Sequence, residues 1–381
     1  MSPVLISNGI EKQLPYTVSK DFAIQAKDDG KVVEVDEKTH MIIVEYNDGT
    51  HEAINLNPVV VKNGGGGFYL SNRMQSHLKK GQRFKKMDVI AQNETFFSTH
   101  YDGVKYNIGT LCKVACMSSF ATFEDSKLIT HKLSKRMSTE MIMNKHIILG
   151  QNATVSYMAK KGQVIQVGED LIRYEQSNNE EAMNQLLRNI GDDMKEEIKN
   201  LGKTSLKSKY NGVIEDIRIY STFDLPELSP SLQKIVGDYW KDIRAKKNLV
   251  KKYKITDPTY SGSTFYEVDG PTRPDEKDRI KGYKVEAGGV IIEFYIKFQD
   301  DVGVGDKVVD FAALKGVVAA VIPEGQEPYC VGKPDEEIST IYPASSVLAR
   351  MTISILPTMF GNKVLVELKR ELKRKYEKGK A

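Results

Sequence analysis

The sequence predicts an α+β fold made mainly of β-structure. Residues 290–292 are all apolar, and from 293 to 298 Glu293, Tyr295 and Lys297 alternate with apolar residues, a pattern that is typical of a largely buried strand. A second β-forming run covers residues 317–322. Near the N-terminus, strand-like runs at 31–35 and 41–46 are followed by Asn-Asp-Gly-Thr at 47–50, which is the strongest hairpin signal in the chain. Helical periodicity appears in fewer segments, so β-structure should dominate.

Composition places the chain among soluble globular proteins. It has 381 residues, of which 40% are hydrophobic and 28% charged, and this length allows two or three domains. No segment approaches the roughly 18 apolar residues that span a bilayer, and residues 1–10 lack the basic start of a signal peptide. The three cysteines, Cys112, Cys116 and Cys330, have no accompanying histidine cluster. Free thiols in a reducing compartment are therefore favoured over a zinc site.

Charge is unevenly distributed along a chain whose net charge is only +4. Basic residues cluster at 79–80, 85–86, 244–254 and 369–380. Such local patches suit a subunit that meets polyanions on some faces and other proteins on the rest.

A short pattern recurs along the chain. Residues 81–90 and 162–172 both have Gly-Gln, an apolar residue, a turn with an acid and then a β-forming run, and residues 303–308 repeat the second half. We interpret this as a recurring β-turn-β device. The four glycines at 64–67 are followed by no Lys-Ser or Lys-Thr, so they predict a flexible loop rather than a phosphate-binding loop.

Two lysines mark the stretch from 304 to 318. Lys307 and Lys315 stand eight positions apart, in what the flanking runs predict to be a loop between two largely buried strands. Rigid strands that hold a cationic loop can present charge to a phosphate chain in a fixed place. The alternative is a surface loop that happens to contain two lysines.

Adjacent acids and a later arginine are the other candidate site residues. Glu124 and Asp125 lie in an otherwise apolar stretch, where carboxylates need a cation, a metal ion or backbone amides as partners. Alternatively they cap a helix that begins nearby. Arg350 follows a proline turn at Pro343 and precedes an apolar run, and the alternative for it is an ordinary surface arginine.

Three segments have helical periodicity. The apolar stripe of residues 178–201 predicts a packed helix. A second helix should begin at Ser229 or Ser231, and its aromatic and aliphatic face suits either a partner or a local core. In the third, Leu365, Leu368, Leu372 and Tyr376 share one face among many lysines and arginines, which could meet a partner, meet a polyanion or lie in solvent.

Several short motifs follow one another along the chain: Ile108-Gly-Thr-Leu leading to Phe123-Glu-Asp, Gly305-Asp-Lys leading to Lys315-Gly-Val-Val, Gly332-Lys-Pro-Asp, Tyr342-Pro and Ala349-Arg-Met-Thr-Ile. In this order they resemble the β subunit of multisubunit DNA-dependent RNA polymerases. The resemblance covers most of the chain, with a large insertion between the first two motifs.

The resemblance implies a double-psi β-barrel built from two discontiguous segments, with a flap domain inserted between them. Residues 1–145 would hold the hybrid-binding region and the first half of the barrel, and residues 146–285 the flap-like domain. Residues 286–362 would complete the barrel and hybrid-binding region, and residues 363–381 would form a basic C-terminal helix.

The resemblance also implies roles for the candidate residues. Lys307 and Lys315 would contact phosphates of the RNA 3′ end and of the incoming nucleotide, and Arg350 would hold the triphosphate, because its planar fork suits phosphate. Glu124 and Asp125 would face, indirectly, the second Mg²⁺ that arrives with the nucleotide. The main Mg²⁺ ligands would lie on a β′-type partner subunit, since nucleotidyl transfer uses two metals.

Departures from the family pattern bear on how the chain works. The polar Arg-His-Gly-Asn expected between the lysines is replaced by largely apolar residues at 308–314, and one extra residue separates Pro343 from Arg350. The upstream β lobes, the C-terminal clamp segment and the Asp-rich Mg²⁺ motif have no counterpart, so we expect a chain that is not active alone. It is similar to one piece of a split β subunit, as in the polymerases of very large bacteriophages.

That interpretation implies partners and a place. The partners would be an N-terminal β part, β′ parts, template DNA, nascent RNA, NTPs and a promoter-recognition factor that meets the flap. The place would be the cytoplasm of an infected cell or the virion, with no membrane. The alternative function is a non-catalytic nucleic-acid-binding or scaffold protein derived from the barrel, which the altered residues 308–314 suggest.

Overall fold

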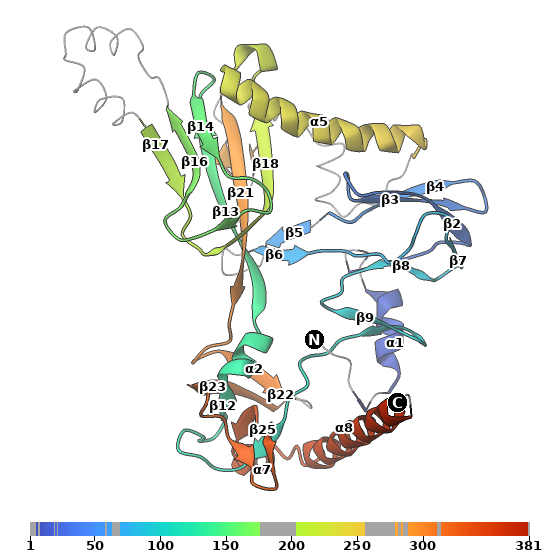
Figure 1. Cartoon of the computed structure of the whole chain (residues 1–381), viewed down its shortest axis with the longest axis vertical. Helices are drawn as coiled ribbons and strands as arrows, with labels where there is room; N and C mark the ends of the chain where they lie inside the picture. Colours follow the sequence, from blue (N-terminus) through green and yellow to red (C-terminus); the bar gives the residue numbers. More distant parts are fainter. Residues whose placement is uncertain are drawn as a thin grey trace, which may run out of the picture. The chain divides into compact units, whose positions relative to one another are not determined.

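The computed structural model describes residues 5–379 apart from 7, 19, 21, 58, 63–68, 176–202, 256–278, 281–282, 285–288 and 311–313. The chain divides into two compact units, each drawn from several segments (Figure 1). The first unit holds Met1–Ala23, Gln92–Thr139 and Asp300–Ala381, and the second Ile24–Ala91 and Glu140–Gln299. The glycine run at 64–67 and the predicted helix at 178–201 lie outside the described residues.

A five-stranded mixed sheet organises the first unit. Its strands are β11 (Val114–Cys116), β12 (Ser126–Thr130), β22 (Lys307–Asp310), β23 (Leu314–Ile322) and β26 (Thr340–Tyr342). Their order is β11–β26–β12–β23–β22. The β11–β26 and β12–β23 pairs are parallel, whereas the β12–β26 and β22–β23 pairs are antiparallel. Strands from two distant parts of the sequence therefore alternate in one sheet, and the predicted mainly-β fold is confirmed.

Within its described residues, the first unit contains eight further elements besides this sheet. They are α1 (Ile10–Thr17), β9 (Phe97–His100), β10 (Gly103–Tyr106), α2 (His131–Arg136), β24 (Tyr329–Cys330), β25 (Lys333–Glu337), α7 (Ala344–Ala349) and α8 (Ile355–Lys378). One small core joins Leu314 and Tyr342 of the sheet to Val347 of α7 and Ile355 of α8. This core fixes α7 and the start of α8 against the sheet.

The second unit contains three main sheets. A six-stranded sheet has the order β15–β18–β21–β13–β6–β5, a four-stranded sheet β4–β3–β2–β7, and a three-stranded sheet β14–β16–β17. The bounds are β1 (Ala23–Gln25), β2 (Gly30–Asp36), β3 (Met41–Tyr46), β4 (His51–Asn55), β5 (Val59–Lys62), β6 (Tyr69–Asn72), β7 (Arg83–Phe84), β8 (Val89–Gln92), β13 (Thr139–Leu149), β14 (Thr154–Met158), β15 (Val164–Ile165), β16 (Asp170–Glu175), β17 (Lys203–Lys207), β18 (Gly212–Ser221), η1 (Leu225–Glu227), α5 (Pro230–Lys252), β19 (Arg279–Ile280), β20 (Tyr283–Lys284) and β21 (Val290–Asp300). The hairpin predicted at 47–50 joins β3 to β4.

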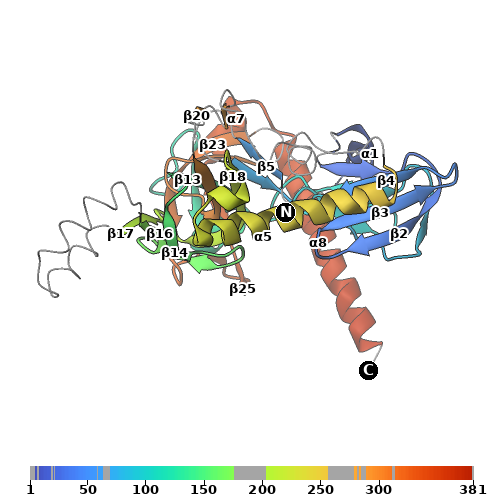
Figure 2. The ribbon, with the colours of Figure 1, turned by 90° about the horizontal axis from the view of Figure 1, so that it is seen from above.

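Helix α5 lies across β14 and β18 near its start and over β3 and β4 near its end (Figures 1 and 2). Ser229 caps it by accepting a hydrogen bond from the Leu232 amide. Leu232 and Val236 are fully buried in the core of the unit, and Leu249 packs on Met41 and Ile43 of β3. Of the two predicted alternatives for this helix, a face that forms local core is the one observed.

The recurring sequence pattern adopts the same local structure wherever it occurs. In its first half, the Gln82 side chain accepts a hydrogen bond from the Lys79 amide at 3.0 Å, and the Gln163 side chain accepts one from the Lys160 amide at 3.0 Å. In its second half, an acid accepts from the amide three residues earlier at 2.8 Å: Asp88, Glu169 and Asp306. The residue before each acid has a positive φ: Met87, Gly168 and Gly305. The β-turn-β interpretation is confirmed.

The compact units group residues differently from the predicted ranges. Residues 24–91, within the range predicted as 1–145, cluster with residues 140–299. The functional labels given to those ranges stay predictions. Within the described part of the chain, no helix has the length and apolar character to cross a membrane.

Candidate functional site

Lys307 and Lys315 lie on strands, which corrects the prediction that they lie in a loop. Lys307 begins β22 and Lys315 is the second residue of β23, and the two strands pair directly as a hairpin. Lys307 is opposite Val317, and Lys315 is opposite Val309. Because cross-strand partners and alternate residues share a face, both lysines lie on the same face of the hairpin. All four side chains are exposed.

The valines that follow Lys307 explain why this segment is a strand that pairs with β23. Val308 and Val309 favour extended backbone and pair with Gly316 and Lys315. Val308 and Leu314 lie on the face opposite the lysines, where Leu314 is fully buried. The apolar residues at 308 and 309 thus belong to a paired hairpin that keeps both lysines on one side.

A glycine turn sets the start of β22. Gly305 has φ +95°, a left-handed conformation that favours glycine, and its amide donates to the Val318 carbonyl at 2.9 Å. The Asp306 carboxylate accepts from the Gly303 amide at 2.8 Å. These bonds place Lys307 at the first paired position of the hairpin.

Lys127 of β12 supports the hairpin from its buried face, a role that the sequence interpretation missed. Lys127 is almost completely buried, with only 2% of its surface exposed. The ammonium forms an ion pair with Asp310 and donates to the Leu314 carbonyl at 2.7 Å. A buried lysine requires such partners, so a lysine within the apolar run 126–130 was the signal that could have pointed to Asp310.

Glu124 and Asp125 lie in the segment just before β12 and cap no helix. The next helix, α2, begins at His131 and has Thr130 as its cap. Glu124 adopts φ +49°, which is unusual for a residue with a side chain. Its carbonyl accepts a hydrogen bond from the buried hydroxyl of Ser346 on α7. This contact holds the unusual backbone and leaves both carboxylates exposed.

Gly316 brings the two acids beside the lysine hairpin. The Val317 amide donates to the Asp125 carbonyl at 3.0 Å. A Cβ at position 316 would lie 2.2 Å from that carbonyl oxygen, so only glycine fits. The Lys315-Gly316 pair therefore combines a charged side chain with the close backbone approach that joins it to Asp125.

Arg350 reaches the acids from the end of α7. Its guanidinium forms a two-pronged ion pair with the Asp125 carboxylate, in which the Nε–Oδ1 distance is 3.1 Å. The predicted cationic partner of the acids is therefore an arginine, and Arg350 is not an isolated surface residue. Among the described residues, the side chains of Lys307, Lys315 and Glu124 form no hydrogen bond or ion pair.

The carboxylates fit a shared magnesium site better than a complete one. No group of three or more His, Cys, Asp or Glu residues in the described part of the chain is arranged to hold a metal. Mg²⁺ takes about six oxygen ligands and often keeps several waters. Glu124 and Asp125 could supply two carboxylates to an ion whose other ligands come from phosphates, water or a second chain.

Large apolar side chains flank the charged residues, and the sequence interpretation gave them no role of their own. Phe123 directly precedes Glu124, and Met351 directly follows Arg350, and both are largely exposed. Phe120 is more exposed still. Apolar groups beside a charged site are common where another molecule completes it.

All three cysteines are free, as predicted, but not all are buried. Cys112 and Cys116 are half-buried, and Cys330 is exposed. Burial raises the pKa of the Cys112 thiol to about 11, so that this thiol stays protonated at neutral pH.

Comparison with known families gives one match that covers most of the chain. A family model described as RNA polymerase Rpb2, domain 6, matches residues 89–375. That span includes Glu124, Asp125, Lys307, Lys315 and Arg350. No curated protein matches the chain.

Proposed function

Because the chain belongs to the RNA polymerase Rpb2 domain 6 family and is thus a β-type RNA polymerase subunit, we propose that it supplies half of an active centre. That half binds the NTP and the RNA 3′ end for DNA-directed RNA synthesis. The chain works as one subunit of a complex and is not active alone.

The observation that carries this proposal is the assembly of distant residues in one unit. Asp125 joins the hairpin that bears Lys307 and Lys315 through its carbonyl, and it joins Arg350 through its carboxylate. Two unpaired ammonium groups on one strand face are suited to a polyanion, and the guanidinium fork is suited to phosphate oxygens.

The charges match what nucleotidyl transfer demands. Negative charge develops on the transferring phosphorus group, and fixed cations stabilise it. In our proposal Lys307 and Lys315 contact phosphates of the RNA 3′ end and the incoming NTP, and Arg350 exchanges the Asp125 carboxylate for the triphosphate. Bound Mg²⁺ supplies further neutralisation of the phosphates. Glu124 and Asp125 would help to hold, indirectly, the ion that arrives with the NTP, and a β′-type partner would supply the main ligands of the other ion.

The same proposal assigns the larger architecture. The five-stranded sheet of the first unit is part of a double-psi barrel, and residues 146–285 form the flap. The chain is then one piece of a split β subunit, similar to those of very large bacteriophages, and acts in the infected cell or the virion. Its partners are the remaining β and β′ parts, template DNA, nascent RNA, NTPs and a promoter-recognition factor.

One observation favours a second function, a non-catalytic nucleic-acid-binding or scaffold protein. Apart from Asp310, the residues between the lysines are apolar. Asp310 itself is held by an ion pair with Lys127. This hairpin could serve as a rigid support without taking part in chemistry.

Purification of the complex separates the two functions. A tagged full-length chain should co-purify with β′-type and N-terminal β-type polypeptides, identified by mass spectrometry, and the complex should extend RNA on a primed template. A complex reconstituted without this chain should not extend RNA. Normal extension by that complex would overturn the first function and support the second.

A further inference from the structure

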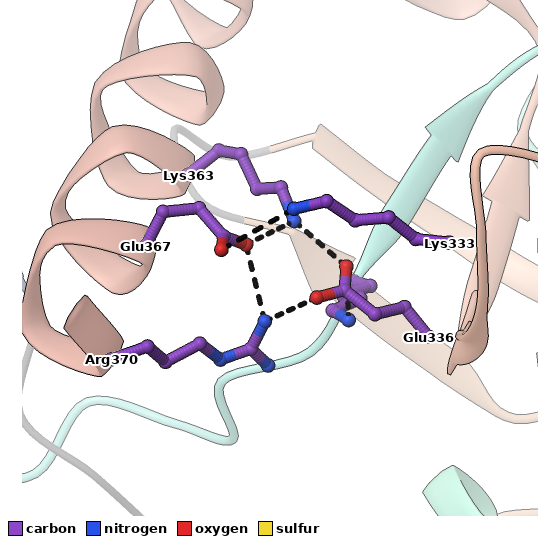
Figure 3. A network of polar contacts seen from close by, with 6 residues as sticks. Lys333, Glu336, Lys363, Glu367 and Arg370 are labelled. Atoms are coloured by element: carbon purple, nitrogen blue, oxygen red, sulfur yellow. Dashed lines mark hydrogen bonds and ion pairs between the residues drawn. The ribbon is translucent and has the colours of Figure 1, made fainter. Parts of the chain in front are cut away.

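Helix α8 has one face that the rest of its unit holds in place. Glu336 of β25 accepts from Lys363 at 3.0 Å and forms an ion pair with Arg370, and Glu367 pairs with Lys333, Lys363 and Arg370 (Figure 3). Lys113 adds a further ion pair to Glu336 at 2.6 Å. This network orients α8 along its middle turns, beyond the core contact at Ile355.

A different face of α8 carries an apolar stripe. Its members recur at spacings of one to four residues and are exposed: Val364 48%, Leu365 38%, Leu368 50% and Leu372 59%. With 3.6 residues per turn, the centre of this stripe lies about 150° around the helix from the centre of the ionic face. The network therefore turns the apolar stripe away from the elements that hold α8.

At the N-terminal end of the stripe, an apolar side chain from another segment packs against the helix. Gly361 lies at the same angular position as the stripe, and a Cβ there would be 2.9 Å from Cδ1 of Ile6. Ile6 thus packs on the helix where a side chain is missing. From Val364 onward the stripe is uncovered by the described residues.

The positive charge of α8 favours a different partner over a second copy of this chain. Residues 369–378 contain six lysines or arginines and two glutamates. Lys369 and Lys375 flank the stripe, at about 85° and about 35° around the helix from its centre. Lys375 pairs with Glu371 at 3.0 Å, and Lys369 has no ion pair among the described residues. A second copy laid on this face would bring the same cations together, and like charges beside a helical seam are destabilising.

We propose that α8 docks an acidic amphipathic helix from a different polypeptide of the same complex. Its apolar residues would cover Leu365, Leu368 and Leu372, and its Asp or Glu residues would pair with Lys369 and Lys375, which flank the stripe. A nucleic acid would satisfy the cations but would leave the leucines in water, so a protein helix fits the surface better. The proposal rests on the proposed function only in taking the partner to be a subunit of that complex.

Site-specific photocrosslinking in the complex purified through the full chain tests this. A photoreactive amino acid at Leu372 should crosslink to a segment of another polypeptide that is helical, amphipathic and rich in Asp and Glu, as mapped by mass spectrometry. Crosslinks only to this chain, to a second copy of it or to nucleic acid, or no crosslink at all, would overturn the proposal.

Substitutions give a second, quantitative test. The pair Leu368→Glu and Leu372→Glu should lower the amount of that polypeptide in the complex about tenfold. The pair Lys369→Glu and Lys375→Glu should lower it less and make it less sensitive to salt. Val331→Glu, at another exposed apolar residue, is the control. Circular dichroism checks that each variant is folded. Unchanged retention in the folded leucine variant would contradict the proposal. Because retention rather than RNA synthesis is measured, this failure is distinguishable from failure of the proposed function.

Discussion

The guanidinium of Arg350 forms a two-pronged ion pair with the carboxylate of Asp125, although 225 positions separate them in the sequence. Both groups belong to the proposed substrate site, and the ion pair fixes the position of the guanidinium. In our proposal a triphosphate takes the place of the Asp125 carboxylate on Arg350.

Replacing Arg350 should weaken nucleotide binding more than it weakens the fold. We expect Arg350→Lys to raise the KM for NTP about tenfold in the reconstituted complex, because lysine cannot make two parallel hydrogen bonds to phosphate. The measurement is the rate of RNA extension against NTP concentration. Arg173→Ala, which removes an exposed arginine paired with Asp170 in the other unit, is the control and should leave KM unchanged. An unchanged KM in Arg350→Lys would remove Arg350 from the site.

Gly316→Ala should destabilise the first unit, because the added Cβ would lie 2.2 Å from the Asp125 carbonyl oxygen. Forcing the two strands apart should cost about 1–3 kcal/mol of unfolding free energy, measured by urea denaturation. Gly332→Ala is the matched control, since no atom lies within 4 Å of a Cβ at that position. Equal stability of the two variants would contradict the close approach of β12 and β23.

The buried pair of Lys127 and Asp310 should behave as a unit. Lys127→Met alone leaves a carboxylate and the Leu314 carbonyl without their partner, and we expect it to cost about 3 kcal/mol of unfolding free energy. Adding Asp310→Val should restore much of that stability, because an apolar pair of similar size needs no compensation. A double-mutant cycle in urea checks this. Additive losses would show that the two groups do not interact.

The ion pairs between Glu336 and α8 should contribute less to the free energy of unfolding in acid. Hydrogen bonds from Lys113 and then Lys363 lower the pKa of Glu336 from 4.5 to about 2. A carboxylate whose pKa is lower in the folded state stabilises the fold above the unfolded pKa, and this stabilisation is lost as the pH falls from 4.5 toward 2. Glu336→Gln should therefore cost about 1 kcal/mol of unfolding free energy at pH 6 and almost nothing near pH 2. A difference that is the same at both pH values would contradict the network.

Local patterns were sufficient to predict much of the fold. The hairpin of β3 and β4, the long strand β21 and the start of α5 at Ser229 follow from alternation, turn residues and a cap, all of which act over a few residues. The recurring turn was recognisable because its hydrogen bonds lie within the repeated residues themselves.

Contacts between distant segments were not accessible in this way. The pairing of Asp125 with Arg350, and of Lys127 with Asp310, depends on which strands become neighbours, which no local pattern specifies. The strand position of the lysines was missed for a different reason. Val308 and Val309 were interpreted only as replacements for the family's polar residues. Their own preference for extended backbone is what makes this segment a strand.

The central claim is that the lysine face of the β22–β23 hairpin binds phosphates during RNA synthesis. The direct measurement is RNA extension by the reconstituted complex that carries both Lys307→Ala and Lys315→Ala. Lys209→Ala together with Lys234→Ala, two exposed lysines of the other unit, gives the same change of charge as a control. The account predicts that extension is abolished in the first variant and unchanged in the control. Full extension by the Lys307→Ala, Lys315→Ala complex would contradict it.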